Sequence, residues 1–204
     1  MNPIANEDAR RYRSELREQQ AATTRERILD ATVRVMANGL ADVTVPAVAR
    51  EARVSVPTVY RHFATKRDLF AALQPHLQRH AGIDPSSVPT SIDALRASLV
   101  SLLNGMDGLD DVMRAAHASP AAEEVRRVHA PNRFRLARRV VDGIAEQLPL
   151  ADRDRIARLL VVMTASPALR MWRDDFGASV EEIADDIDRA IRAAIADAER
   201  ETPR

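Results

Sequence analysis

The chain has 204 residues, 46% hydrophobic and 29% charged, which excludes intrinsic disorder and is typical of a globular protein with a sizeable core. It contains no cysteine, which excludes disulfides, thiol catalysis and cysteine–zinc sites, and no apolar run approaches the ~20 residues of a membrane span. The formal net charge is zero, with twelve Lys and Arg against nine Asp and Glu (+3) in residues 1–70, so any nucleic acid must be bound through local charge placement.

The first 22 residues are polar and contain no apolar stripe that would bury a helix. Their arginines, among them Arg10, Arg11, Arg13 and Arg17, are balanced by carboxylates. We therefore expect residues 1–22 to be a flexible N-terminal extension, disordered or frayed. The alternative is an arm whose arginines reach the minor groove of bound DNA. No signal peptide is recognisable, so the cytoplasm is the expected location.

A first helix is predicted to begin at Thr23, because Thr23 and Glu26 have the spacing of a capping box. Gly39 is placed to cap its C-terminal end. This helix should support the helices that follow it. Its predicted buried stripe is Ile28, Leu29, Thr32, Val35 and Met36.

Residues 44–63 predict two short helices joined by a tight turn. Thr44 can cap the first helix and Ser55 the second, while Arg53 and Val54 form the turn between them. Two such helices with a turn of about 3–4 residues are a helix-turn-helix, whose second helix enters the DNA major groove. The second helix should bury Val56, Val59 and Phe63 and leave outward Pro57, Thr58, Arg61 and His62, with Tyr60 at the boundary.

A further helix is predicted to begin at Thr65, where Thr65 and Asp68 form a box-like cap. Lys66, the only lysine in the chain, falls in its first turn, where the helix dipole disfavours a cation by a few tenths of a kcal/mol. A lysine at a helix N-terminus is well placed to clamp a DNA phosphate. The alternative is a solvated surface lysine.

His76 and His80 stand four residues apart on the same predicted helix, a spacing that can ligate a metal. No carboxylate or cysteine at a matching offset accompanies them, so we expect solvated histidines and no metal site. The sequence predicts no cofactor either.

These residues resemble the DNA-binding signature of the TetR family of bacterial transcriptional regulators. The resemblance is carried by Val48-Ala49, Ala52-Arg53-Val54-Ser55, Val59-Tyr60-Arg61-His62-Phe63, Lys66 and Leu69, within roughly residues 23–73. It implies an all-α fold with an N-terminal three-helix helix-turn-helix domain and a C-terminal helical domain for ligand binding and dimerisation. The family usually has glycine where Arg53 stands, so Arg53 is either part of a tighter turn or kept for a phosphate contact.

The helix-turn-helix pattern and the resemblance together give the candidate DNA-binding residues. They are Thr44, Arg53, Ser55, Pro57, Thr58, Tyr60, Arg61, His62 and Lys66. The expected partner is a double-stranded DNA operator.

A stretch rich in Gly, Pro and Ser at residues 81–91 predicts a linker. It would separate a DNA-binding domain at residues 23–80 from an effector-binding and dimerisation domain at residues 92–204. The terminal helices of this second domain are more apolar than one core requires. The resemblance implies a homodimer formed through residues 152–176 and 179–200, which would bind a near-palindromic operator.

The resemblance also implies a small-molecule effector in the C-terminal domain that releases the DNA. Adaptable, aromatic or polar side chains are the candidate ligand-binding residues, with ordinary core packing as the alternative for each. They are Met106, Met113, His117, Phe134, Met163 and Trp172. The few aromatic residues and the absence of a charged cluster favour an apolar ligand.

The sequence therefore predicts a dimeric, ligand-responsive repressor with no membrane partner. An effector-independent regulator or an activator of the same fold is the alternative. An all-helical enzyme is disfavoured, because no G-x-S-x-G motif, glycine-rich loop or triad spacing is present. A helical interaction module would leave Tyr60, His62 and Lys66 unexplained together.

Overall fold

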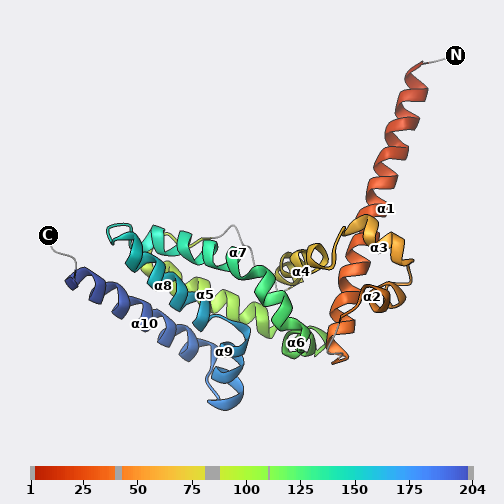
Figure 1. Ribbon diagram of the computed structural model, residues 1–204. Helices are drawn as coiled ribbons and strands as arrows, with labels where there is room; N and C mark the ends of the chain where they lie inside the picture. Colours follow the sequence, from red (N-terminus) through yellow and green to blue (C-terminus); the bar gives the residue numbers. More distant parts are fainter. Residues whose placement is uncertain (1–2, 40–42, 81–87, 110, 202–204) are drawn as a thin grey trace.

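The computed structural model describes residues 3–39, 43–80, 88–109 and 111–201, and all regular structure in these residues is helical (Figure 1). The predicted all-α fold class is confirmed. The helices are α1 (Pro3–Ala37), α2 (Val45–Glu51), α3 (Val56–His62), α4 (Lys66–His80), α5 (Ile92–Asp107), α6 (Asp111–Ala118), α7 (Ala121–Ile144), α8 (Leu150–Met163), α9 (Ser166–Arg170), the π-helical η1 (Met171–Asp175) and α10 (Val180–Glu201). None of these is long and apolar enough to cross a membrane.

Helix α1 begins much earlier than the sequence predicted. Residues 3–22, expected to be a disordered or frayed extension, form its N-terminal part, which projects away from the rest of the molecule in Figure 1. The Thr23 hydroxyl donates to the carbonyl of Gln19 at 2.9 Å, so the predicted cap at Thr23 is wrong. Alanine, arginine, glutamate and glutamine favour helix without burial, which explains why the helix continues here. Gly39 caps the other end with φ +71°.

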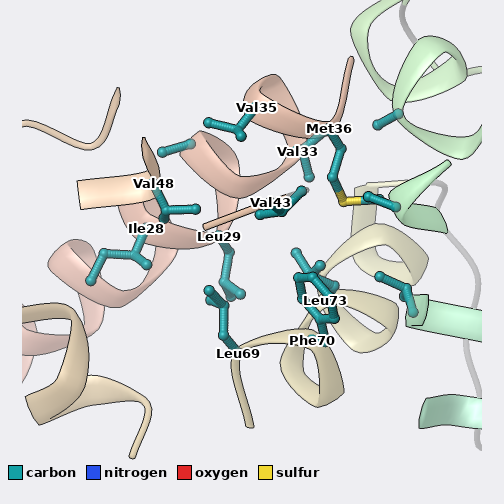
Figure 2. Close-up of a cluster of buried hydrophobic side chains, with 14 of the residues drawn as sticks. Ile28, Leu29, Val33, Val35, Met36, Val43, Val48, Leu69, Phe70 and Leu73 are labelled. Atoms are coloured by element: carbon teal, nitrogen blue, oxygen red, sulfur yellow. The ribbon is translucent and has the colours of Figure 1, made fainter. Parts of the chain in front are cut away.

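The N-terminal core joins α1, α2 and α4 and continues into the C-terminal half. Figure 2 shows its centre, where Ile28, Leu29, Val33, Met36, Val48, Leu69, Phe70 and Leu73 converge. Leu109, Met113 and Val125, which follow the predicted linker, belong to the same buried cluster. Helix α1 packs directly against α6. Residues from both predicted domains therefore belong to this one buried cluster. Residues 81–87 of the predicted linker lie outside the described residues.

A second core lies between α5, α7, α8 and α10, which run side by side in Figure 1. Its fully buried centre consists of Val141, Ile156, Ile183, Ile187 and Ile191. A capping box begins α10, since the Ser179 amide donates to Glu182 at 2.8 Å and the Glu182 amide to Ser179 Oγ at 3.2 Å.

Helices α1 and α4 also meet through a buried histidine. His76 is fully buried, with Nδ1 2.9 Å from a carboxylate oxygen of Glu26 and Nε2 2.9 Å from one of Asp30. The prediction of solvated histidines is wrong for His76, because α1 supplies carboxylates that are distant in the sequence. His80 is exposed, as predicted.

Helix α7 is tied to α4 by His129, whose buried Nε2 donates to the Phe70 carbonyl at 2.9 Å. Burial lowers the pKa of His129, and the charge of Arg133 lowers it further, against the hydrogen bond to Phe70. The imidazole is therefore held neutral between the two helices. This hydrogen bond is a polar link between the N-terminal core and the helices of the C-terminal half.

The lowered pKa of His129 predicts a loss of stability in mild acid. The unfolded chain, with a histidine pKa of about 6.5, binds a proton more readily than the folded chain. The free energy of unfolding should therefore be at its full value above about pH 6.5 and fall as the pH decreases toward the folded-state pKa. His129→Gln, which keeps a donor for Phe70, should show a smaller fall in urea denaturation between pH 7.5 and 5.5. An identical fall in both proteins would contradict this.

Candidate nucleic-acid interface

The two helices of the helix-turn-helix begin with the predicted caps. Thr44 Oγ1 accepts from the amide of Ala47 at 3.3 Å, and Ser55 Oγ accepts from the amide of Thr58 at 3.3 Å. Ser55 Oγ also lies 2.8 Å from Thr58 Oγ1. These bonds satisfy free amides of the first turns and fix the orientation of the Thr58 hydroxyl at the start of α3.

The turn between α2 and α3 has the hydrogen bonds of a Schellman motif. The amide of Val54 donates to Ala49 at 2.9 Å, and that of Arg53 donates to Arg50 at 3.1 Å. Arg53 has φ +54° and is the one non-glycine residue with positive φ among the described residues. An L-residue in this conformation costs about 1 kcal/mol, and the Arg53 side chain is exposed and buries nothing in return. A contact outside the chain would explain why arginine stands here.

Helix α3 buries Val59 and presents its other side to solvent. Phe63 is also buried, as predicted, and the guanidinium of Arg25 on α1 lies 4.9 Å from its ring centre. Tyr60 is 49% exposed. We call the exposed residues of this surface, which are Arg53, Ser55, Pro57, Tyr60 and Arg61, the recognition edge.

Thr58 and His62 are half-buried beside the recognition edge. Burial lowers the pKa of His62, and the charges of Arg61 and Arg25 lower it further, so its imidazole is neutral at pH 7. Arg25 comes from α1, outside the helix-turn-helix, and no sequence pattern indicated that its charge lies here.

Lys66 is already paired in the structure. Its Nζ lies 2.9 Å from a carboxylate oxygen of Glu124 on α7 and 5.0 Å from the ring centre of Phe70. The predicted cap at the start of α4 is confirmed, because the amide of Asp68 donates to Thr65 Oγ1 at 3.1 Å and Thr65 donates back. Lys66 can contact a phosphate only if the bond to Glu124 is given up.

A cavity of about 650 Å³ is lined by residues of α1, α4, α5, α6, α7, α8 and α9. Of the six candidate ligand-binding residues, Met106 and His117 line it. The other four do not: Met113 belongs to the N-terminal core, Phe134 and Met163 pack against the second core, and Trp172 stacks edge-on with Phe176 at 6.0 Å. Methionines and aromatics at helical spacing have the same pattern whether they face a core or a cavity, so the sequence could not separate them.

The cavity is mainly apolar but carries positive charge from Arg126 and Arg133, and none of its described lining residues is Asp or Glu. His117 and His129 also line it, and burial lowers the pKa of both. Arg126 is paired with Glu123 at 2.8 Å, whereas Arg133 donates to the backbone carbonyl of Val161 at 3.2 Å. Burial lowers the pKa of the Arg133 guanidinium, as does the charge of Arg126. The predicted absence of a charged cluster is therefore wrong for this cavity.

Comparison with known proteins agrees with the geometry. The family model described as bacterial regulatory proteins, tetR family, matches residues 28–73. Uncharacterised HTH-type transcriptional regulators of Mycobacterium bovis and Mycobacterium tuberculosis are 31% identical over 142 residues, 67% of this chain and 71% of theirs. A TetR transcriptional regulator from Rhodococcus sp. RHA1 shares the fold with a TM-score of 0.55 and 23% identity, covering 87% of this chain and 97% of that one. Another transcriptional regulator from that organism has a TM-score of 0.56 and 22% identity, covering 88% and 99%.

The strained backbone at Arg53 provides a test of its role. Arg53→Gly should be more stable than Arg53→Ala by about 1 kcal/mol in urea denaturation, because glycine tolerates positive φ. Both variants should bind DNA fragments from around the gene more weakly than the parent. The slope of log affinity against log salt should decrease by about one for each phosphate that is no longer neutralised. Unchanged affinity and slope in both variants would mean that Arg53 does not touch DNA.

Proposed function

This chain belongs to the TetR family of bacterial regulatory proteins, and from this we propose that it is a homodimeric repressor that binds a near-palindromic operator through α3. It is a helix-turn-helix transcriptional regulator and not an enzyme. A small molecule bound in the C-terminal half releases it from DNA in the cytoplasm. The observation that supports DNA binding most directly is the recognition edge, an exposed surface built on a capped helix and a strained arginine.

The residues on and beside the recognition edge differ in which part of the DNA they can reach. Ser55, Pro57 and Thr58 lie at the N-terminal end of α3, the end that contacts base edges in helix-turn-helix proteins. Arg53 lies in the turn before α3 and Lys66 is the first residue of α4 after it, and both carry charges that phosphates attract. Tyr60 and Arg61 lie between them. Base preference therefore comes from the start of α3 and affinity from its flanks.

The proposed dimer is formed through residues 152–176 and 179–200. Leu159 and Val162 are 44% and 64% exposed and lie on one face of α8, three residues apart. Exposed positions of α10, such as Glu181 and Asp185, carry charge. An apolar face of this kind on α8 is suited to burial against a second copy, and α10 would border it.

The cavity supports an effector-responsive protein over the effector-independent alternative. Its mainly apolar lining suits an apolar ligand, the kind that the sequence favours. Arg133 adds a requirement, since it has no carboxylate partner in the part of the chain that the structure describes. A ligand with an anionic group at one end would supply that partner, because a partly buried cation is stabilised by an opposite charge. We infer an amphipathic acid as the effector.

The pairing of Lys66 provides a test of DNA binding in which one variant should gain affinity. Glu124→Gln frees the lysine and should strengthen binding up to about fivefold, since an exposed ion pair contributes about 0.2–1 kcal/mol. Lys66→Ala should weaken binding to all sequences and lower the salt dependence. Fluorescence anisotropy with fragments from around the gene measures both.

Glu123→Gln is the matched control, because Glu123 precedes Glu124 on α7 but pairs with Arg126. It should leave DNA affinity unchanged. If Lys66→Ala kept both the affinity and the salt dependence of the parent, the phosphate contact of Lys66 would be refuted.

The effector class can be tested with straight-chain carboxylic acids and alcohols matched in length. Acids should raise the melting temperature more than alcohols and release bound DNA, because the carboxylate meets Arg133. Arg133→Gln should remove the difference between acid and alcohol. Arg139→Gln, an exposed arginine on the same helix, should preserve it. Equal shifts for acid and alcohol in the parent protein would refute an anionic effector.

A further inference from the structure

His76 and its neighbours form a cluster that DNA binding and the effector cavity do not use. One ligand atom from each of Asp30, His76 and His80 lies within 4.8 Å of the other two. The histidines are four residues apart on α4, and the aspartate comes from α1. Because Asp30 belongs to another helix and is distant in the sequence, the spacing of the two histidines does not reveal this third candidate ligand.

Both imidazoles are held so that Nε2 is free to bind a cation. His76 Nδ1 lies 2.9 Å from Glu26 Oε2, and His80 Nδ1 lies 3.0 Å from the carbonyl of His76. Because carboxylate and carbonyl oxygens only accept, each Nδ1 carries a hydrogen, so Nε2 is the ring nitrogen that can bind a cation. A carboxylate behind a histidine in this way is the usual outer partner of a metal-bound imidazole.

Glu26 is held in place by Arg79 as well as by its contact with His76. Arg79 Nη2 donates to Glu26 Oε1 at 3.0 Å and to Oε2 at 3.3 Å, and the same Oε2 lies 2.9 Å from His76 Nδ1.

The Nε2 atom of His76 is the feature that needs a ligand. It is buried, makes no hydrogen bond within the residues that the structure describes, and yet lies 2.9 Å from Asp30 Oδ1. A metal ion bound to both atoms would satisfy this pair, as would a hydrogen on Nε2, and the two cases differ in whether the cluster binds a metal. Ligand atoms of a tetrahedral zinc ion are about 3.3 Å apart, so small side-chain rotations would open this pair to the required spacing.

We propose that Asp30, His76 and His80 bind a divalent transition-metal ion, with Glu26 positioning His76. Two imidazoles and one carboxylate suit zinc, cobalt or nickel rather than magnesium or calcium. The side chain of Asp30 is 40% exposed and His80 is exposed, so the ion enters from solvent and keeps a water ligand. The bound ion cross-links α1 to α4 and stiffens the support of the helix-turn-helix.

Zinc titration of the untagged full-length protein, stripped with a chelator, tests the site by calorimetry and melting temperature. The parent should bind one zinc ion per chain at this cluster and melt at a higher temperature with zinc but not with magnesium. His80→Ala and Asp30→Asn should each lower zinc affinity more than tenfold. Glu26→Gln should lower it about 10- to 100-fold, the usual effect of losing an outer carboxylate.

Glu18→Gln, an exposed carboxylate on the same helix as Glu26, is the matched control and should keep the parent's zinc affinity. The alternative is a protonated His76 that bridges Glu26 and Asp30 without any metal. In that case the parent would show neither stoichiometric zinc binding nor a zinc-dependent melting shift, and the proposal would be overturned. Zinc binding that survives both His80→Ala and Asp30→Asn would overturn it equally.

Discussion

Helix α4 links the helix-turn-helix to the C-terminal half, because it packs against both α1 and α7. Leu69, Phe70 and Leu73 anchor it in the core beneath α1 and α2. The hydrogen bond from His129 to Phe70 and the ion pair between Lys66 and Glu124 join it to α7. Since α6 and α7 also contribute to that core, a displacement of α7 cannot leave the helix-turn-helix where it was.

This connection would give the proposed effector a physical route to the operator. Residues of α4 and α7 are among those that line the cavity, so a ligand that fits one arrangement of these helices better than another would shift the equilibrium between them. Its effect is limited to that difference in affinity. Glu124 would also compete with DNA for Lys66, since Lys66 cannot bond fully to this carboxylate and to a DNA phosphate at once.

The sequence predicted features that depend on neighbours within a few residues. The caps at Thr44, Ser55 and Thr65 and the turn at Arg53 and Val54 are all local. The sequence could not predict the bond between Lys66 and Glu124, or the carboxylates around His76, because these partners come from other helices. It also missed the N-terminal part of α1, where helix propensity acts without an apolar stripe. Likewise, periodicity marks a side chain as inward-facing but does not say whether it meets a core or a cavity.

The neutral charge of the chain has its own consequence for DNA release. With no net charge, attraction to DNA comes from a few cations on the recognition edge and near it, and acts over about 8 Å at physiological salt. A single head of this kind binds weakly, and useful affinity requires two heads on one duplex. A small rotation of either α4 that moves one head out of register then removes most of the affinity. Weak individual contacts therefore make the proposed dimer easy to release with a ligand of modest differential affinity.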